Sequence, residues 1–429
     1  MTTADQWLDA APAHWTRGRL KNLIAAATNG TWGADPSGDG SDVRCVRAAD
    51  FDRECRRVDL SNAPLRHVDP ASLRQHLLRP GDLILEKSGG GEKQPVGMAV
   101  LFTDRDRAVC SNFCARIKPS DDVDPRFLTY VFAAAYGQGL TQAAIKQTTG
   151  IQNLDTGAFF ASRWAYPAPE EQRRIADFLD AETAGMDRLV ESQVRLTELL
   201  EEREEAAISL ALSRAAASTI RLKHLLVAPP SYGANEAAEH DRRDWPRYIR
   251  TTDITEDGTL RDETFASLPP EVAQRYLLED GDILLVRSGS TTGKAFLYES
   301  RLGPAAHAGY LIRARVDHRA ILPRLVWYFC QTPAYWQQIS EGAVKSTIQN
   351  VNAEKYGNIV VPFIEPGRQV STLQQIDSLT HTSKRLKERA LRLLDLLAER
   401  RQALITAAVT GTFDVSTASG RNVAEGVGV

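Results

Sequence analysis

The stretch Arg79–Gly89, with the sequence RPGDLILEKSG, is the key to the fold because it occurs twice in this chain. It returns 200 residues later as Glu279–Gly289, EDGDILLVRSG. Each copy has a Gly-Asp turn, then a short apolar run typical of a buried β-strand, then a serine-glycine break. A turn and strand that recur in this way indicate an internal repeat.

Other short markers recur in the same order at intervals close to 200 residues, which supports the repeat. The pairs are Arg19–Lys21 with Arg221–Lys223, Ile151–Asn153 with Ile348–Asn350, Pro167 with Pro362, and Leu199–Arg203 with Leu396–Arg400. Residues 28–70 and 228–275 share little sequence, as expected of two binding modules with one scaffold and different ligands. Ordinary drift after duplication is the alternative explanation.

Each copy ends in a long helical pattern. Eleven positions spaced three and four residues apart from Ile175 include eight apolar side chains, and the same holds for eleven positions from Thr372. A stripe of this length predicts two helices of ~60 Å that pair as a coiled coil. Residues 168–218 carry 6 basic and 12 acidic side chains, and residues 363–429 carry 9 and 7, so pairing is electrostatically favourable. Packing of each helix on its own globular domain is the alternative.

We therefore predict an α+β fold with two similar globular domains, separated by two long helices that pair as an antiparallel coiled coil. The chain would have an internal pseudo-two-fold repeat. The predicted segments are residues 1–168 (first globular domain), 169–215 (central helix), 216–363 (second globular domain), 364–411 (distal helix) and 412–429 (a disordered tail).

Composition predicts a cytoplasmic protein with real hydrophobic cores. The chain has 429 residues, of which 43% are hydrophobic, and its net charge of -3 does not by itself favour nucleic-acid binding. It has no apolar run of about 18 residues, so no membrane span is expected. Its five cysteines include no Cys-x-x-Cys pair, which predicts reduced thiols.

The sequence carries no recognisable catalytic motif. Ser288–Lys294 is similar to a phosphate-binding loop, but only three residues separate Gly289 from Gly293, and Ala295 replaces the magnesium-binding hydroxyl residue. The eight histidines have no metal-ligand spacing. We therefore predict no catalytic residue, no metal site and no cofactor in this chain; an undetected hydrolase is the alternative.

Several segments resemble the specificity subunits of type I restriction-modification systems. Tyr166–Asp180 (YPAPEEQRRIADFLD) resembles the entry into that family's central helix, and Leu397–Gly411 (LAERRQALITAAVTG) resembles the exit of its distal helix. Pro12–Lys21 is similar to the start of the proximal recognition domain. Pro366–Val370 departs from the pattern, because the first copy has Glu170–Gln172 at this place.

The resemblance implies a DNA-recognition subunit without catalysis of its own, acting in phage defence. Each globular domain would be a target recognition domain that reads one half of a bipartite, asymmetric site in double-stranded DNA. The helices would set the spacing and dock two methyltransferase subunits, and restriction subunits with translocase and nuclease activity would join them. AdoMet, ATP and magnesium would belong to those partners. The alternative is a non-catalytic RNA- or protein-binding scaffold whose helices form an oligomerisation module.

The expected DNA contacts lie in the polar loops that follow the apolar strands and in two arginine-rich runs. Arg, Lys, Asn and Gln read base edges, whereas hydroxyl side chains and main-chain N–H groups contact the backbone. The candidate residues are Lys87, Ser88, Gly89, Lys93, Lys146, Gln147, Arg44 and Arg47 in the first copy, and Arg287, Ser288, Thr291, Thr292, Lys294, Lys345, Arg247 and Arg250 in the second. Solvated hairpin loops and surface ion pairs are the alternatives. Because Gln152–Asn153 and Gln349–Asn350 recur, we expect them to hold the shared loop rather than discriminate bases.

Overall fold

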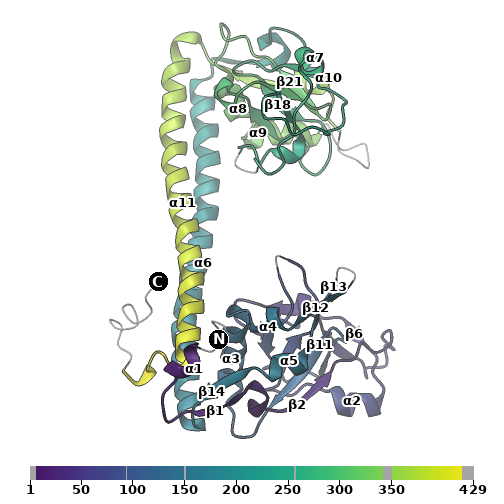
Figure 1. Cartoon of the computed structure of the whole chain (residues 1–429). Coiled ribbons are helices and arrows are strands. Elements are labelled where there is room, and N and C mark those ends of the chain that lie inside the picture. The colour runs from purple at the N-terminus through teal and green to yellow at the C-terminus, as the bar shows by residue number, and fades with distance from the viewer. Residues whose placement is uncertain (1–5, 93, 149–150, 256–257, 342–349, 418–429) are drawn as a thin grey trace. The chain divides into compact units, whose positions relative to one another are not determined.

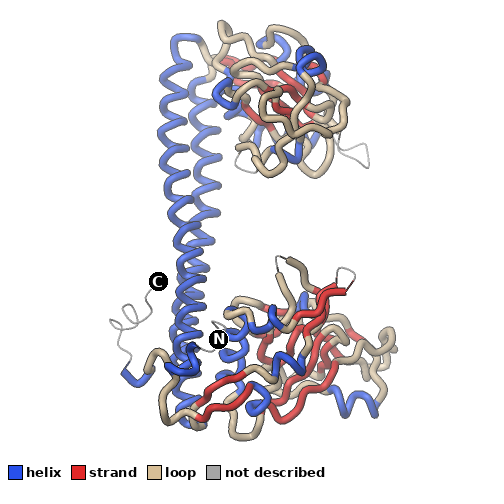
Figure 2. The backbone as a smooth tube through the Cα atoms, viewed as in Figure 1, coloured by secondary structure: helices blue, strands red, loops and turns tan. Residues whose placement is uncertain are grey.

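The computed structural model describes residues 6–92, 94–148, 151–255, 258–341 and 350–417, and it divides into two compact units (Figures 1 and 2). Unit 1 comprises Met1–Gln193 and Leu391–Val429, and unit 2 comprises Val194–Ala390. Each unit contains one sheet-rich domain and a part of both long helices. The predicted mixed fold of two sheet-rich domains and two paired helices is confirmed.

Unit 1 is built around a six-stranded sheet in the order β2-β11-β7-β9-β5-β4. The first copy of the repeated stretch forms β7 (Leu83–Glu86), which lies antiparallel between β11 (Cys114–Pro119) and β9 (Ala99–Leu101). The other strands are β1 (Thr16–Arg19), β2 (Ile24–Asn29), β3 (Val43–Val46), β4 (Phe51–Asp52), β5 (Arg57–Val58), β6 (Leu65–Arg66), β8 (Ser88–Gly89), β10 (Ala108–Cys110), β12 (Ile145–Thr148), β13 (Ile151–Leu154) and β14 (Arg163–Tyr166). The shorter helices are α1 (Gln6–Ala10), α2 (Pro70–His76), α3 (Pro125–Gly137), α4 (Leu140–Ala143) and α5 (Thr156–Phe160).

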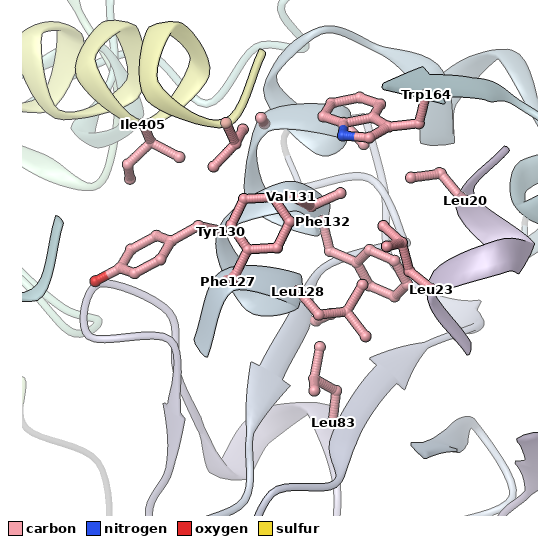
Figure 3. Packing of buried hydrophobic residues seen from close by; sticks show 14 of the residues in the cluster. Leu20, Leu23, Leu83, Phe127, Leu128, Tyr130, Val131, Phe132, Trp164 and Ile405 are labelled. Carbon is pink, nitrogen blue, oxygen red and sulfur yellow. The ribbon is translucent and has the colours of Figure 1, made fainter. Parts of the chain in front are cut away.

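The apolar run of β7 is buried on both faces, as its composition predicts. Leu83 belongs to the cluster that includes Phe127 and Phe132 of α3 (Figure 3), whereas the next residue, Ile84, belongs to a second cluster. Alternating side chains of a strand point to opposite faces, so this one strand joins two cores. Ile405, from the second long helix, packs into the first of them (Figure 3).

Unit 2 repeats this plan with a four-stranded sheet in the order β16-β21-β18-β19. The second copy of the repeated stretch forms β18 (Ile283–Val286), antiparallel to β19 (Ala295–Leu297) and β21 (Leu311–Ala314). The other strands are β15 (Ser218–Arg221), β16 (Ser231–Tyr232), β17 (Arg247–Ile249), β20 (Ala305–His307) and β22 (Val360–Phe363). The shorter helices are α7 (Pro270–Ala273), α8 (Pro323–Phe329), α9 (Pro333–Glu341) and α10 (Ala353–Asn358).

The recurring Gly-Asp turn is explained by a buried ion pair next to each central strand. Asp82 pairs with Arg116 of β11 at 2.7 Å, and Asp282 pairs with Arg315 at 2.8 Å. Each carboxylate also accepts a main-chain N–H from the residue three positions earlier. The glycine before each aspartate has φ of 97° and 86°, a region that favours glycine. The marker is therefore a structural device of both units.

The long helices α6 (Pro169–Ala215) and α11 (Pro366–Thr410) pack together in both units. In unit 1, Leu179 of α6 and Leu404 of α11 belong to one buried cluster, and in unit 2 Leu212 and Ile376 belong to another. The beginning of α6 thus meets the end of α11, and the end of α6 meets the beginning of α11, as an antiparallel pair requires. The same clusters include side chains of the sheet-rich domains, so the helices pack on those domains as well.

Opposite charges join the acidic α6 to the more basic α11. In unit 1, Arg401 of α11 pairs with Asp187 of α6. In unit 2, Lys387 of α11 pairs with Glu204 of α6 at 3.0 Å. The predicted charge complementarity between the helices is therefore realised in both units.

Each long helix has a buried glutamine in its first turn that ties it to its domain. Gln172 accepts a hydrogen bond from the N–H of Asp124 at 3.1 Å and donates to the carbonyl of Pro167 at 3.0 Å. Gln369 accepts from the N–H of Leu322 at 2.9 Å and donates to two main-chain carbonyls at 2.8 Å. Although the sequence at the start of the second helix differs from that of the first, it retains the equivalent glutamine, Gln369, which makes these bonds.

Two tyrosines make a second matched connection between domain and helix. Tyr130 donates to Asp180 of α6, and Tyr328 donates to Asp377 of α11, both at 2.7 Å. An arginine four residues before each tyrosine pairs with the same aspartate at 2.9 and 2.7 Å. The junction between domain and helix is thus built identically in the two units.

The segment expected to be a disordered tail is packed where it is described. Phe413 is buried against Phe178 of α6, with ring centroids 5.7 Å apart, and a short 3-10 helix follows at Val415–Thr417. Residues 418–429 lie outside the described residues. The five cysteines are free thiols. Among the helices that the structure describes, none is long and apolar enough to cross a membrane.

A buried histidine predicts a pH-dependent stability of unit 2. Burial lowers the pKa of His307 to about 4, an effect that the carbonyl of Tyr276 opposes. As the pH is lowered from 6.5 to 4, the unfolded chain takes up a proton that the folded chain does not. The free energy of unfolding therefore decreases by as much as about 3 kcal/mol over this range. The strand registers place Cys110 at the equivalent position of unit 1. Denaturant unfolding of His307→Cys should therefore show a smaller loss between pH 6.5 and 4.5 than the wild-type chain; equal losses would contradict this assignment.

Candidate nucleic-acid interface

In unit 1 the predicted residues Ser88, Gly89, Lys146 and Gln147 lie in a small three-stranded sheet in the order β12-β13-β8, of which Figure 1 labels β12 and β13. Ser88 donates to the side chain of Asn153 at 2.7 Å, and Lys87 donates to the side chain of Asn29 at 2.9 Å. Gly89 has φ of 113°, and a side chain at this position would meet nothing within 4 Å. The chain after β7 therefore presents open backbone beside a lysine and two amide side chains.

The hairpin β12–β13 carries the other candidates of unit 1. Lys146 is exposed and pairs with Asp155 at 2.7 Å, an interaction that water screens strongly. Gln147 lies in β12, but its side chain is not among those described, and Lys93 lies outside the described residues. The structure thus brings Lys146 close to the strand that pairs with Ser88 and Gly89.

In unit 2 the equivalent loop places Arg287 between an aromatic ring and an amide. Its guanidinium lies 5.1 Å from the ring centroid of Tyr232, and its Nε donates to Asn350 at 3.3 Å. Within the described residues, Nη1 and Nη2 of Arg287 have no hydrogen-bond partner. Ser288 forms a β-bridge with Asn350, as Ser88 pairs with Asn153. This arginine is therefore positioned by its neighbours and keeps donors available.

The remaining loop candidates of unit 2 differ in their exposure. Thr291 is exposed, but Thr292 is buried and donates to the carbonyl of Gly289 at 2.7 Å, so it shapes the turn. Lys294 is half-buried and donates to the carbonyl of Thr255 at 3.3 Å. Lys345 lies outside the described residues.

Two of the predicted arginines are engaged with buried aspartates. Arg47 makes two hydrogen bonds to Asp50, at 3.0 and 2.7 Å, and Arg250 makes two to Asp253, at 3.1 and 2.8 Å. The bond to Asp253 raises the pKa of Arg250, and the aspartates are 4% and 0% exposed. These pairs favour an internal role, although Arg250 also lines a hollow together with Tyr310.

The other two arginines bond to main-chain carbonyls across the same loop. Arg44 donates to the carbonyl of Ala63 at 2.7 Å, and Arg247 donates to that of Arg261. An Arg-x-x-Arg-x-x-Asp pattern therefore occurs in both residues 28–70 and residues 228–275, which were expected to have little in common. Its side chains form the bonds that hold equivalent loops in the two units. The shift of this pattern to an interval of 203 residues conceals it in the sequence.

Exposed aromatic side chains beside the predicted loops are the functional candidates that the sequence analysis missed. Phe113 is 49% exposed and directly precedes β11, the neighbour of β7. Tyr310 is 63% exposed and directly precedes β21, the neighbour of β18. The two residues are 197 positions apart, the interval of the Ile-Gln-Asn marker, so the repeat could have revealed them. Among the described residues, no group of His, Cys, Asp and Glu side chains could hold a metal ion.

Comparison with known proteins agrees with this architecture. The specificity subunit of the type I restriction enzyme StySPI from Salmonella potsdam is 21% identical over 340 residues, which are 75% of this chain and 73% of that protein. A chain from a solved type I restriction-modification system, whose complex assembly and conformational transition were determined, aligns with a TM-score of 0.69. It is 16% identical, and the alignment covers 94% of this chain and 99% of that one.

The chain resembles the specificity subunits of type I restriction enzymes. The resemblance rests on the sequence of the curated relative and on the fold shared with the solved system. The HsdS subunit from Thermoanaerobacter tengcongensis also aligns, at 16% identity over 94% of this chain and 98% of that one, with a TM-score of 0.49. No family model matches the chain.

The buried Arg250–Asp253 pair makes a prediction that separates an internal from a DNA-binding role. Arg250→Ala would leave the Asp253 carboxylate buried without its cation, so we expect unit 2 to lose about 3–5 kcal/mol of stability. Denaturant unfolding measures this loss. Arg242→Ala is the matched control, because Arg242 and its partner Asp244 are both exposed. A loss no larger than that of the control would show that Arg250 is not structural.

Proposed function

We propose that this chain is the DNA-recognition subunit of a type I restriction-modification complex. Each sheet-rich domain would read one half of a bipartite, asymmetric site in double-stranded DNA. The observation that carries the proposal is the repeated framework, which holds chemically different, half-buried cationic residues at equivalent places, Lys87 and Arg287. The likeness to specificity subunits supports it.

The two loops have the chemistry that base reading requires. Arginine and lysine donate to guanine, asparagine can pair with adenine, and open glycine backbone allows close approach to phosphates. Lys87 and Arg287 are each held by a neighbouring amide or ring, which reduces the conformational entropy lost on binding. Of the other loop residues, we assign Ser88, Ser288 and Thr291 to contacts with the DNA backbone, and Lys146 remains a candidate DNA contact.

We further propose that the α6–α11 pair sets the spacing between the two half-sites and docks two methyltransferase subunits. At 1.5 Å per residue, the 47 residues of α6 form a rod of about 70 Å, longer than one DNA turn of about 34 Å. Paired helices fix a distance that a flexible linker cannot fix. Exposed apolar side chains suit a protein partner; they are Leu189, Val194, Leu196, Leu199 and Leu210 on α6, and Val370, Leu379, Leu386, Leu391, Leu393 and Leu396 on α11.

Catalysis would belong to the partners in this proposal. The methyltransferase subunits would bind AdoMet, and restriction subunits would supply ATP-driven translocation and magnesium-dependent cleavage. The complex would act in the cytoplasm, where it meets incoming phage DNA. This chain would recognise the DNA sequence at which those activities act.

Gel-shift titration of the chain, alone and with the methyltransferase subunit of its host, tests the proposal. We expect tight, sequence-dependent binding of double-stranded DNA only by the complex. Binding of RNA in preference to DNA, or hydrolysis by the chain alone, would contradict the proposal.

Removal of the positively charged Arg287 side chain should change the salt dependence of DNA binding by the complex. Arg287→Ala should weaken DNA binding about tenfold and reduce the slope of log K against log salt by about 1 if the side chain neutralises a phosphate. Loss of affinity at an unchanged slope would instead assign it to a base. Arg301→Ala is the control, because Arg301 is exposed in the same unit and pairs with Glu299. The same affinity and slope in both variants would remove this loop from the interface.

A further inference from the structure

We infer that three matched positions determine which bases each domain reads: Asn29, Lys87 and Phe113 in unit 1, and Tyr232, Arg287 and Tyr310 in unit 2. The inference rests on the proposed DNA-recognition function and deepens it. The internal repeat allows the two proposed recognition domains to be compared position by position within one chain. Positions that build the scaffold should be the same in both units, and positions that read different half-sites should be equivalent in place but different in chemistry.

Main-chain hydrogen bonds establish that two of the positions are equivalent. The N–H of Lys87 donates to the carbonyl of Phe113 at 2.9 Å, and the N–H of Arg287 donates to the carbonyl of Tyr310 at 2.9 Å. The strand ahead of each cation is the central strand of its sheet. Each cationic residue therefore lies opposite an exposed aromatic residue in the strand pairing.

Strand register establishes the third pair. Asn29 of β2 lies opposite Ala115 of β11, and Tyr232 of β16 lies opposite Ile312 of β21. Ala115 and Ile312 are 197 residues apart, the same interval that separates Phe113 from Tyr310. The side chain at this position contacts the cation in both units, as an amide hydrogen-bonded to Lys87 and as a ring beneath the Arg287 guanidinium.

The serine after the cation and the asparagine that pairs with it are the same in both units, which separates these scaffold positions from the three that differ. Ser88 and Ser288 follow the cations, and each pairs in a β-ladder or bridge with an asparagine, Asn153 or Asn350. The side chain of Asn153 accepts a hydrogen bond from Ser88, and that of Asn350 accepts one from Arg287, so an asparagine holds the loop in each unit. The serine and the asparagine are therefore the same in the two units, whereas the residues at the three matched positions differ.

The chemistry of the three positions differs in the way that base discrimination requires. Unit 1 offers a point-charge ammonium, an amide and a phenyl ring that cannot form a hydrogen bond. Unit 2 offers a planar fork of donors and two phenol groups, of which Tyr310 is 63% exposed. Arginine can make two parallel hydrogen bonds to guanine, whereas lysine makes point contacts and a phenyl ring suits the methyl group of thymine. Two different half-sites are the expected consequence.

The test exchanges the readers between units in the complete complex with the methyltransferase subunit. The variant Asn29→Tyr, Lys87→Arg, Phe113→Tyr places the side chains of unit 2 on unit 1. Selection from a DNA library with randomised half-sites reads out the preferred bases. We expect preference at one or more positions of a single half-site to change by about tenfold or more, while the other half-site and the spacing stay as in the wild type.

Single exchanges guard against misfolding and provide a matched control. Lys87→Arg and Phe113→Tyr are conservative surface changes, and Lys118→Arg makes the same lysine-to-arginine change at an exposed position of β11. Only the first two should alter base preference. A folded variant that binds with an unchanged preference at both half-sites would overturn the inference, and so would loss of affinity without altered preference. If the wild-type complex shows no sequence preference for DNA, the proposed function itself fails.

Discussion

A buried carboxylate must be paired, and this constraint organises both units of the chain. Asp82 and Asp282 directly precede the central strands and pair with Arg116 and Arg315. Asp50 and Asp253 each end a short 3-10 helix and pair with the arginine three residues earlier. Removing one partner of such a pair leaves a charge without solvation, which costs several kcal/mol. These pairs are therefore the parts of a duplicated domain that can change least, and they hold the strands and loops in one register.

A fixed framework gives the exposed positions freedom to change. Side chains that face solvent beside it, such as those of Phe113 and Tyr310, contribute little to folding and can take whatever chemistry a ligand requires. The same division appears at the helices, where buried glutamines and tyrosine–aspartate bonds tie each domain to its helix in the same way. One framework can then support two different sets of side chains at equivalent positions.

Much of this organisation could be predicted from the sequence, because the framework leaves short recurring markers. The Gly-Asp turn, the Ile-Gln-Asn marker and the apolar stripes predict the repeat, the central strands and the paired helices. The Arg47–Asp50 and Arg250–Asp253 staples could not be recognised, since their interval differs from that of the other markers. The arginine runs suggested DNA contacts, but side-chain partners such as Asp253 come from the fold. The 197-residue interval could have paired Phe113 with Tyr310, but their exposure comes from the fold, because an aromatic residue in a sequence suggests a core.

The central claim is that this chain selects the DNA sequence that other subunits modify. Mapping of methylated bases by long-read sequencing, in host cells with and without the intact gene, tests it most directly. The account predicts one bipartite motif, with two different half-sites at a fixed separation, that is methylated only when the chain is present. Methylation patterns that are identical in the two strains, while the methyltransferase subunit is expressed in both, would contradict it.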